Sequence, residues 1–150
     1  MDKKTKILNL VFVVFITVLI AMSFSSCDAI NKIKYGYENN AQFVVKSDTY
    51  VDSELLDTCV KVITSEKCIN SALSKTETTI SYDEFLKNLT IVYVEGSGII
   101  NLRFWGFEDA ENKIIIEAFM EYLQTEIEGI SCELLQITTI NHKNQWEGKL

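Results

Sequence analysis

The chain has 150 residues, 47% of them hydrophobic, and its 14 Lys and Arg against 21 Asp and Glu give a formal net charge of −7. This length allows one domain with a single hydrophobic core beyond an N-terminal membrane segment. Binding to phosphate backbones requires concentrated positive charge, so the acidic balance excludes nucleic acid as a partner.

The N-terminus joins a basic flank to a long apolar segment. Lys3, Lys4 and Lys6 fall in residues 1–6, the predicted cytoplasmic n-region, and residues 7–24 carry no charge. As a helix, residues 7–24 would reach about 27 Å, just enough to cross a bilayer. The pattern predicts a single-pass anchor in the cell (inner) membrane, with the N-terminus cytoplasmic and the remainder on the extracytoplasmic side.

A second interpretation of the same region is a lipoprotein signal. The stretch "FSSC" places the small residues Ser25 and Ser26 before Cys27, the candidate lipid-attachment residue, although Phe24 stands where an aliphatic residue is expected. The apolar segment is also longer than the core of most signal peptides, which favours the uncleaved anchor. Both interpretations export the rest of the chain.

A polar connector over residues 25–40 leads to the first predicted strand, "AQFVV" at 41–45. The apolar residues of "DSELLDTCVKVITS" fall on one helical face, with Asp52 or Ser53 placed to cap the helix. Ser65 can cap a second short helix in "EKCINSALSK".

A third helix and a hairpin follow. "SYDE" has capping-box spacing, so Ser81 is predicted to cap the helix "YDEFLKNL" while Glu84 reaches back. "LTIVYVE" and "IINLRFW" then read as two strands around the turn "GSG". Alternation in the second strand places Ile100, Leu102 and Phe104 on one face and Asn101, Arg103 and Trp105 on the other.

The strongest helix pattern is "GFEDAENKIIIEAFMEYLQTEIEG", with Asp109 as the predicted N-cap and Gly129 at the C-terminal end. Its predicted inward residues are Ile115, Ile116, Phe119, Met120, Leu123 and Ile127. "CELLQITTI" supplies the last strand of an exported domain over residues 41–141, and residues 142–150 form a polar tail.

This order of elements predicts an α+β fold. One N-terminal membrane helix precedes a small layered domain of about four strands with a long packed helix. Cys59 and Cys68 would lie about 13 Å apart on one continuous helix, but a break near Ser65 and the presence of Cys132 leave the disulfide state open. Buried free thiols are the favoured interpretation.

The residues predict no catalytic, cofactor or metal site, and we expect no enzyme. The single histidine, His142, is predicted to be exposed, with no partner at metal-ligand spacing. Trp105 beside Arg103, and Trp146, could stack on a sugar ring, but an aromatic side chain packed on a sheet is the favoured reading of Trp105.

Several quoted stretches resemble the polysaccharide chain-length determinant family, the Wzz-type co-polymerases, which include capsule proteins that modulate a tyrosine kinase. The resemblance begins at "YGYENNAQFVV" and continues through "LLDTCVKVITSEKCINSAL". It is most specific over "ISYDEFLKNLTIVYVEGSGIINLRFWGFEDAENKIIIEAFMEYLQTEI", and "LLQITTI" resembles the strand before the family's second membrane span. The similarity covers about residues 35–140.

The resemblance implies a non-enzymatic membrane protein of capsule, exopolysaccharide or O-antigen biosynthesis. Such a protein self-associates into a homo-oligomer and influences how long a polysaccharide polymerase extends its product, with no catalytic residues. The implied partners are the polymerase or a full-length co-polymerase in the membrane, and the polysaccharide itself.

Two alternatives remain beside this reading. The family's proline-containing stretch and second span are not found after "LLQITTI", where the sequence reads "NHKNQWEGKL". A truncated regulatory paralogue that joins full-length rings is therefore one alternative. The other is a cell-surface binding module attached through a lipid on Cys27.

Overall fold

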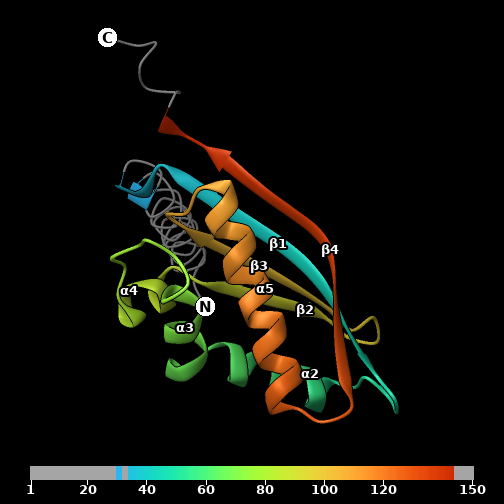
Figure 1. The fold of residues 1–150 in the computed structure, drawn as a ribbon. Helices are drawn as coiled ribbons and strands as arrows, with labels where there is room; N and C mark the ends of the chain where they lie inside the picture. The colour runs from blue at the N-terminus through green and yellow to red at the C-terminus, as the bar shows by residue number, and fades with distance from the viewer. Residues whose placement is uncertain (1–29, 32–33, 144–150) are drawn as a thin grey trace, which may run out of the picture. The chain divides into compact units, whose positions relative to one another are not determined.

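A four-stranded antiparallel sheet and the four helices α2 to α5 make up most of the described chain (Figure 1). The structure, a computed structural model, describes residues 30, 31 and 34–143. The predicted n-region, the apolar segment and Cys27 lie outside these residues. The chain divides into two compact units, and the unit that begins at Tyr35 holds the sheet and these helices.

The sheet has the strand order β2-β3-β1-β4. The strands are β1 (Tyr37–Ser47), β2 (Thr90–Val94), β3 (Ile99–Trp105) and β4 (Ile130–Asn141). All three pairings are antiparallel. The first strand in the chain is therefore an inner strand, flanked by the hairpin on one side and by the last strand on the other.

β1 begins earlier than the sequence indicated. The predicted connector ran to residue 40, whereas the strand starts at Tyr37. The polar residues Glu38, Asn39 and Asn40 pair with residues of both β3 and β4. Because neighbours on both sides satisfy their backbone groups, these residues are extended despite their low strand propensity.

β4 carries an irregularity opposite the middle of β1. Gln42 pairs with Gln136 and Phe43 with Leu134, so Leu135 is an extra residue in β4. This is the arrangement of a β-bulge, in which the additional side chain is left unpaired. Leu135 is 47% exposed.

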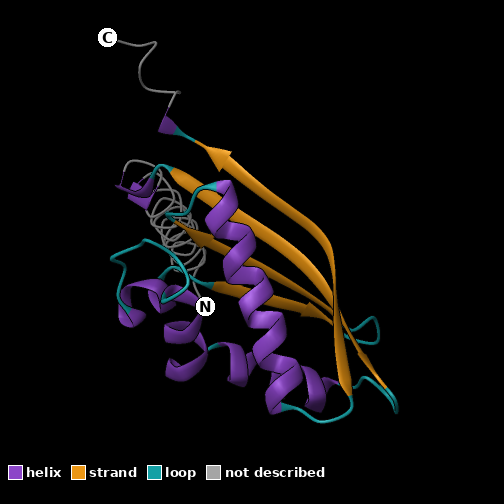
Figure 2. Cartoon of the chain, in the orientation of Figure 1, coloured by secondary structure: helices purple, strands orange, loops and turns teal. Residues whose placement is uncertain are grey.

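The helices cover one face of the sheet, and the other face carries none of the helices α2 to α5 (Figure 2). These are α2 (Ser53–Ile63), α3 (Glu66–Leu73), α4 (Tyr82–Lys87) and α5 (Asp109–Glu126). Within the described residues, no helix is both long and apolar enough to cross a membrane.

At the N-terminus of each of the three short helices, a side-chain oxygen accepts a hydrogen bond from a backbone amide. Asp52 Oδ1 accepts from the Leu55 amide at 2.9 Å, and Ser65 Oγ accepts from the Cys68 amide at 3.3 Å. Ser81 Oγ accepts from the Glu84 amide at 3.3 Å, which places Ser81 at the N-cap of α4. Each bond satisfies an amide that has no partner within its helix.

The predicted N-cap of the long helix was wrong by one residue. Glu108 occupies the cap position with extended backbone, and Asp109 is the first helical residue. The chain just before the helix is held by Asn39, whose side chain bonds to both backbone groups of Phe107. The Glu108 carboxylate makes no cap hydrogen bond and instead accepts from the Tyr37 hydroxyl at 3.1 Å.

The core lies between the sheet and the helices. Phe85, Phe104, Phe107 and Phe119 form a ring cluster with centroid separations of 5.4 to 6.1 Å among the contacting pairs. Edge-to-face and tilted geometries of this kind add to the free energy gained by burying the rings. Of the residues predicted to face inward from α5, Ile115, Ile116, Phe119 and Leu123 are fully buried, and Met120 and Ile127 pack partly against the core.

The predicted α+β class, with four strands and a long packed helix, is therefore confirmed. The strand alternation predicted for β3 is also correct, because Ile100, Leu102 and Phe104 are buried beneath the helices.

Candidate functional site

The face of the sheet without helices, called the open face below, carries alternate side chains from all four strands. Strand register aligns these side chains in rows across the sheet. Two middle rows consist of Val92–Asn101–Gln42–Gln136 and Thr90–Arg103–Asn40–Thr138. Next to them lies an aliphatic row, Val94–Ile99–Val44, which ends on Glu133.

The two middle rows form a depression with a cavity volume of about 300 Å³, called the groove below. Side chains from every strand of the sheet line it. Amides and hydroxyls predominate, and Arg103 is the only charged side chain among the described residues that line the groove. This composition contrasts with a chain that has 21 Asp and Glu residues.

Hydrogen bonds fix part of the groove. Gln42 Nε2 donates to Asn101 Oδ1 at 2.7 Å, and Asn101 Nδ2 donates to the Val92 carbonyl at 3.4 Å. Gln136 and Thr138 form no side-chain hydrogen bond within the described part of the chain. Their donors and acceptors therefore face solvent.

Arg103 is held at the border of the groove. Its Nε donates to Glu38 Oε1 at 2.9 Å, and its guanidinium carbon lies 5.3 Å from the centroid of the Trp105 ring. Stacking on an aromatic face is favourable for a guanidinium, which is weakly hydrated. The charge of Arg103 is thus largely matched by Glu38.

At one end of the sheet the two ends of the domain meet. The His142 amide donates to the Gly36 carbonyl at 2.7 Å, and Tyr37 pairs with Asn141. The Lys143 ammonium lies 4.3 Å from the centroid of the Tyr37 ring. We call residues 36–38 and 141–143 the terminal clasp.

The prediction that His142 is exposed was wrong. The residue is 5% exposed, its Nε2 lies 3.1 Å from Glu38 Oε2, and its ring lies 5.8 Å from the Trp105 ring between centroids. The strand β4 continues to Asn141 and so carries the histidine onto the sheet. His142 Nδ1 is buried with no hydrogen-bond partner among the described residues.

Glu38 links the clasp to the groove. Burial by itself raises the pKa of Glu38, but the hydrogen bond with His142 and the charge of Arg103 outweigh it, so the pKa lies below that of an ordinary glutamate. The Asn40 side chain also lowers the pKa of this carboxylate. Glu38 is therefore ionised at neutral pH and holds residues of β1, β3 and the clasp together.

Trp105 is 4% exposed and packed between Arg103 and His142, as the favoured reading of this residue expected. It has no free ring face for a sugar. Trp146, the other candidate for stacking, and Cys27, the candidate lipid-attachment residue, lie outside the described residues. The predicted cap residues Ser81 and Asp109 are on the helical side of the domain, away from the groove.

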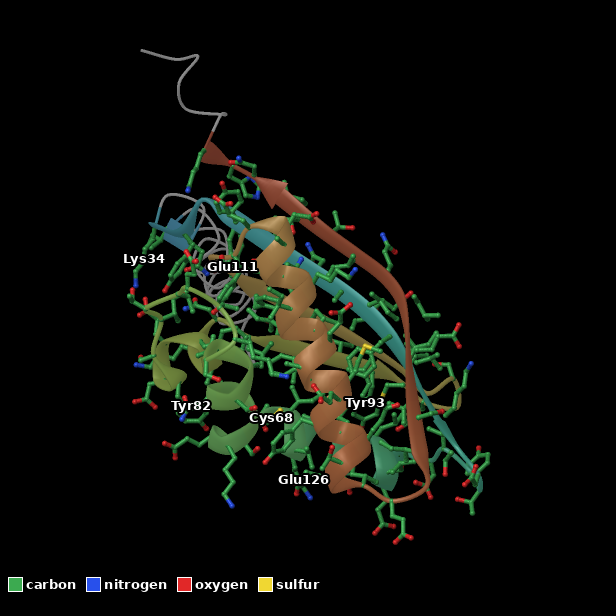
Figure 3. The ribbon with its side chains drawn as sticks, in the orientation of Figure 1. Lys34, Cys68, Tyr82, Tyr93, Glu111 and Glu126 are labelled. Atoms are coloured by element: carbon green, nitrogen blue, oxygen red, sulfur yellow. The ribbon has the colours of Figure 1, made fainter. Side chains whose placement is uncertain are left out.

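The cysteines Cys59, Cys68 and Cys132 are free, and the first two are buried as expected. Burial raises the pKa of Cys59 to about 11. Burial, and then the charge of Glu126, raise the pKa of Cys68 to about 12 (Figure 3). Burial raises the pKa of Cys132 to about 12 as well. Thiols with such values are poor nucleophiles at neutral pH.

The described residues contain no group of three or more His, Cys, Asp or Glu side chains that could hold a metal ion. The arrangement on the open face can instead bind through hydrogen bonds, because its amides and hydroxyls both donate and accept.

Sequence reasoning missed the groove although a signal was present. Asn40 and Gln42 alternate with buried residues of β1, and Asn101 does the same in β3. Gln136 on β4 is exposed and stands next to the half-buried Ile137. Amides at successive outward positions of several strands indicate a polar sheet face. The predicted connector over residues 25–40 hid Asn40, and the pairing that aligns Gln42, Asn101 and Gln136 in one row cannot be read from a single sequence.

No protein-family model matches this sequence, and no curated protein matches it significantly.

Proposed function

We propose that the protein is a non-enzymatic, membrane-attached component of polysaccharide biosynthesis that modulates polymer chain length through oligomeric assembly. The resemblance to the chain-length determinant family motivates this proposal. The resemblance rests on the order of the elements: a strand, helices, a hairpin, a long helix and a strand. The elements of the structure follow the same order, which supports the proposal.

The observation that carries the proposal is the terminal clasp. The chain enters the domain at Tyr35, and the backbone bond between His142 and Gly36 brings the far end of β4 back to the same end of the sheet. A domain with this arrangement can be held to a membrane from one end. Family members, in which a membrane span precedes and another follows the domain, require such an arrangement.

Self-association has surfaces available to it. Val92 and Val94 on β2 are 57% and 49% exposed, and Ile140 on β4 is 40% exposed. β2 and β4 are also the two edge strands, whose outer backbone groups have no partner strand among the described residues. Edges and aliphatic residues of this kind are common sites of contact between chains.

The test is the length distribution of the cell's capsular or lipid-linked polysaccharide. It is compared on a gel for the parent strain, a strain with this gene deleted and a strain with the gene restored. We expect a shift on deletion that restoration reverses. An unchanged ladder would contradict the proposed function.

A second measurement addresses assembly and partners. The intact protein, solubilised in detergent, is expected to form ring-sized oligomers and to co-purify with the polymerase or with a full-length co-polymerase. Co-purification only with the full-length co-polymerase would favour the truncated regulatory paralogue. A strictly monomeric protein that binds neither partner would count against both.

The stretch "FSSC" supports a second candidate, a lipid-anchored binding module on the cell surface. In this case cells fed a labelled fatty acid incorporate it into the wild-type protein, and Cys27→Ala abolishes the incorporation. Equal labelling of the two proteins would remove this candidate.

A further inference from the structure

We propose that the groove on the open face binds an uncharged saccharide segment of a few sugar units. The inference rests on the proposed function for the presence of polysaccharide near the protein. The recognition chemistry is argued from the groove alone.

The charge of the groove selects against ionic ligands. Arg103 is its single cation among the described lining residues, and Arg103 already donates to Glu38 at 2.9 Å. A phosphate or carboxylate ligand requires charge-assisted donors that are not already matched by an acid. A cationic ligand would find no carboxylate in the two middle rows. The groove therefore suits a ligand without charge.

The backbone of the groove selects against an extended peptide. Peptides that add to a sheet pair with an edge strand, through backbone groups that are still free. The centre of the groove lies over β1 and β3, and each of these strands already pairs on both sides. Only side chains are offered to a ligand at this place.

The side chains of the groove select for hydroxyls. Gln136 and Thr138 are exposed, and their side chains have no hydrogen-bond partner among the described residues. The Gln42 amide uses one of its donors on Asn101. An apolar ligand would leave these groups buried and unsatisfied, at a cost in free energy. A sugar hydroxyl can donate a hydrogen bond to an amide oxygen or accept one from an amide N–H, so it can pair with either end of an amide side chain.

The dimensions of the groove suit several sugar units. Four side chains in a row, one from each strand, span about 14 Å because adjacent strands lie roughly 4.8 Å apart. At one end of a row Val92, 57% exposed, offers an aliphatic contact for the C–H face of a sugar ring. The bond between Gln42 and Asn101 fixes the middle of the row before a ligand arrives.

The test uses the full chain and three neutral hexasaccharides, maltohexaose, cellohexaose and chitohexaose, measured by titration calorimetry. Hexagalacturonate and hexaglutamate serve as acidic probes. The detergent must have a head group that is not a sugar, because a glycoside detergent would compete for the groove.

Gln136→Ala and Thr138→Val alter the groove at an edge strand, where loss of one side chain leaves the core untouched.

Asn70→Ala is the matched control, since Asn70 is an exposed amide on α3, on the helical side. We expect at least one neutral hexasaccharide to bind, Gln136→Ala and Thr138→Val to weaken the binding each by about fivefold to tenfold, and Asn70→Ala to leave it unchanged. Melting temperatures of the three variants equal to that of the wild type exclude misfolding as the cause of weaker binding.

Three results would overturn the inference: no binding of any neutral hexasaccharide, binding that the groove substitutions do not weaken, or tighter binding of the acidic probes. These results are separable from failure of the proposed function. A polysaccharide ladder that shifts on deletion, without binding at the groove, removes only the inference. Binding at the groove without a shift of the ladder removes only the chain-length role.

Discussion

The side chain of Asn39 brackets the backbone of Phe107: its Oδ1 accepts from the Phe107 amide at 3.1 Å, and its Nδ2 donates to the Phe107 carbonyl at 2.8 Å. Both residues are fully buried. Asn39→Ala would leave two backbone groups unsatisfied, so we expect a loss of about 3 kcal/mol in the free energy of unfolding.

Asn40→Ala is the control for this change, because Asn40 is the same residue type on the open face of the same strand. Urea denaturation of the purified protein measures both. Equal, small losses for Asn39→Ala and Asn40→Ala would show that the contacts of Asn39 with Phe107 do not hold the start of α5.

A second prediction concerns the inward face of α5. Phe119 is fully buried, whereas Ile114 on the same helix is 37% exposed. Phe119→Asp places an unpaired charge in the core and should cost more than about 4 kcal/mol, enough to unfold the domain. Ile114→Asp should cost less than about 1 kcal/mol. Circular dichroism during heating distinguishes the two, and similar melting of both variants would contradict the assigned face.

The turn between β2 and β3 offers a matched pair of glycines. Gly96 and Gly98 have φ values of +75° and +68°. The backbone of a residue other than glycine is strained at such values. A Cβ at Gly98 would lie 2.5 Å from the Val45 carbonyl oxygen, whereas one at Gly96 meets nothing within 4 Å. We therefore expect Gly96→Ala to cost about 1 kcal/mol and Gly98→Ala clearly more. Indistinguishable unfolding free energies would refute the close approach.

Glu38 should make stability depend on pH. Its pKa is lower in the folded protein than the value of about 4.3 for an unfolded glutamate, so folding favours the ionised form. The resulting stability is fully present above the unfolded pKa and is lost as the pH falls through the folded pKa.

The melting temperatures of the wild type and Glu38→Gln should accordingly differ most at neutral pH and converge below about pH 4. Glu117→Gln, a change at an exposed position of α5, is the control. A difference between wild type and Glu38→Gln that stays constant from pH 7 to pH 3 would contradict the role of the Glu38 charge.

The raised thiol pKa values predict slow alkylation of the native domain. With values of about 11 for Cys59 and about 12 for Cys68 and Cys132, the thiolate fraction at pH 8 is very small. In a Cys27→Ser background, iodoacetamide should react on the order of a hundredfold more slowly with folded than with urea-unfolded protein. Cys132 should react first in the folded state although its pKa is not the lowest, because it is partly exposed to the reagent whereas Cys59 and Cys68 are buried. Equal rates in the two states would contradict the burial of these thiols.

Periodicity and capping rules were sufficient for most of the helices. Ser65 and Ser81 were predicted as caps from the residues that follow them, and both occupy the N-cap positions of α3 and α4. The start of α5 was misplaced because its position depends on Asn39, a residue remote in sequence, and not on a local cap. Long-range contacts of this kind are not visible in a window of neighbouring residues.

The candidate site was harder to predict than the fold. Its residues come from four strands, and only the register brings Gln42, Asn101 and Gln136 into one row. Strand pairing also creates the environment of His142, because it places Glu38 of β1 and Trp105 of β3 beside this residue. A single sequence contains the alternation of each strand but not the order in which the strands pair.

The position of β1 inside the sheet has a kinetic consequence. Asn39 on β1 and Thr139 on β4, which share a hydrogen bond, are 100 residues apart in the chain. Pairing over such separations is slow, because the intervening chain must be ordered before the contact stabilises it. A chain that emerges N-terminus first, from a ribosome or a translocation channel, cannot close this sheet until Asn141 is out. Until then one edge of β1 remains open to chaperones and to other unfinished chains.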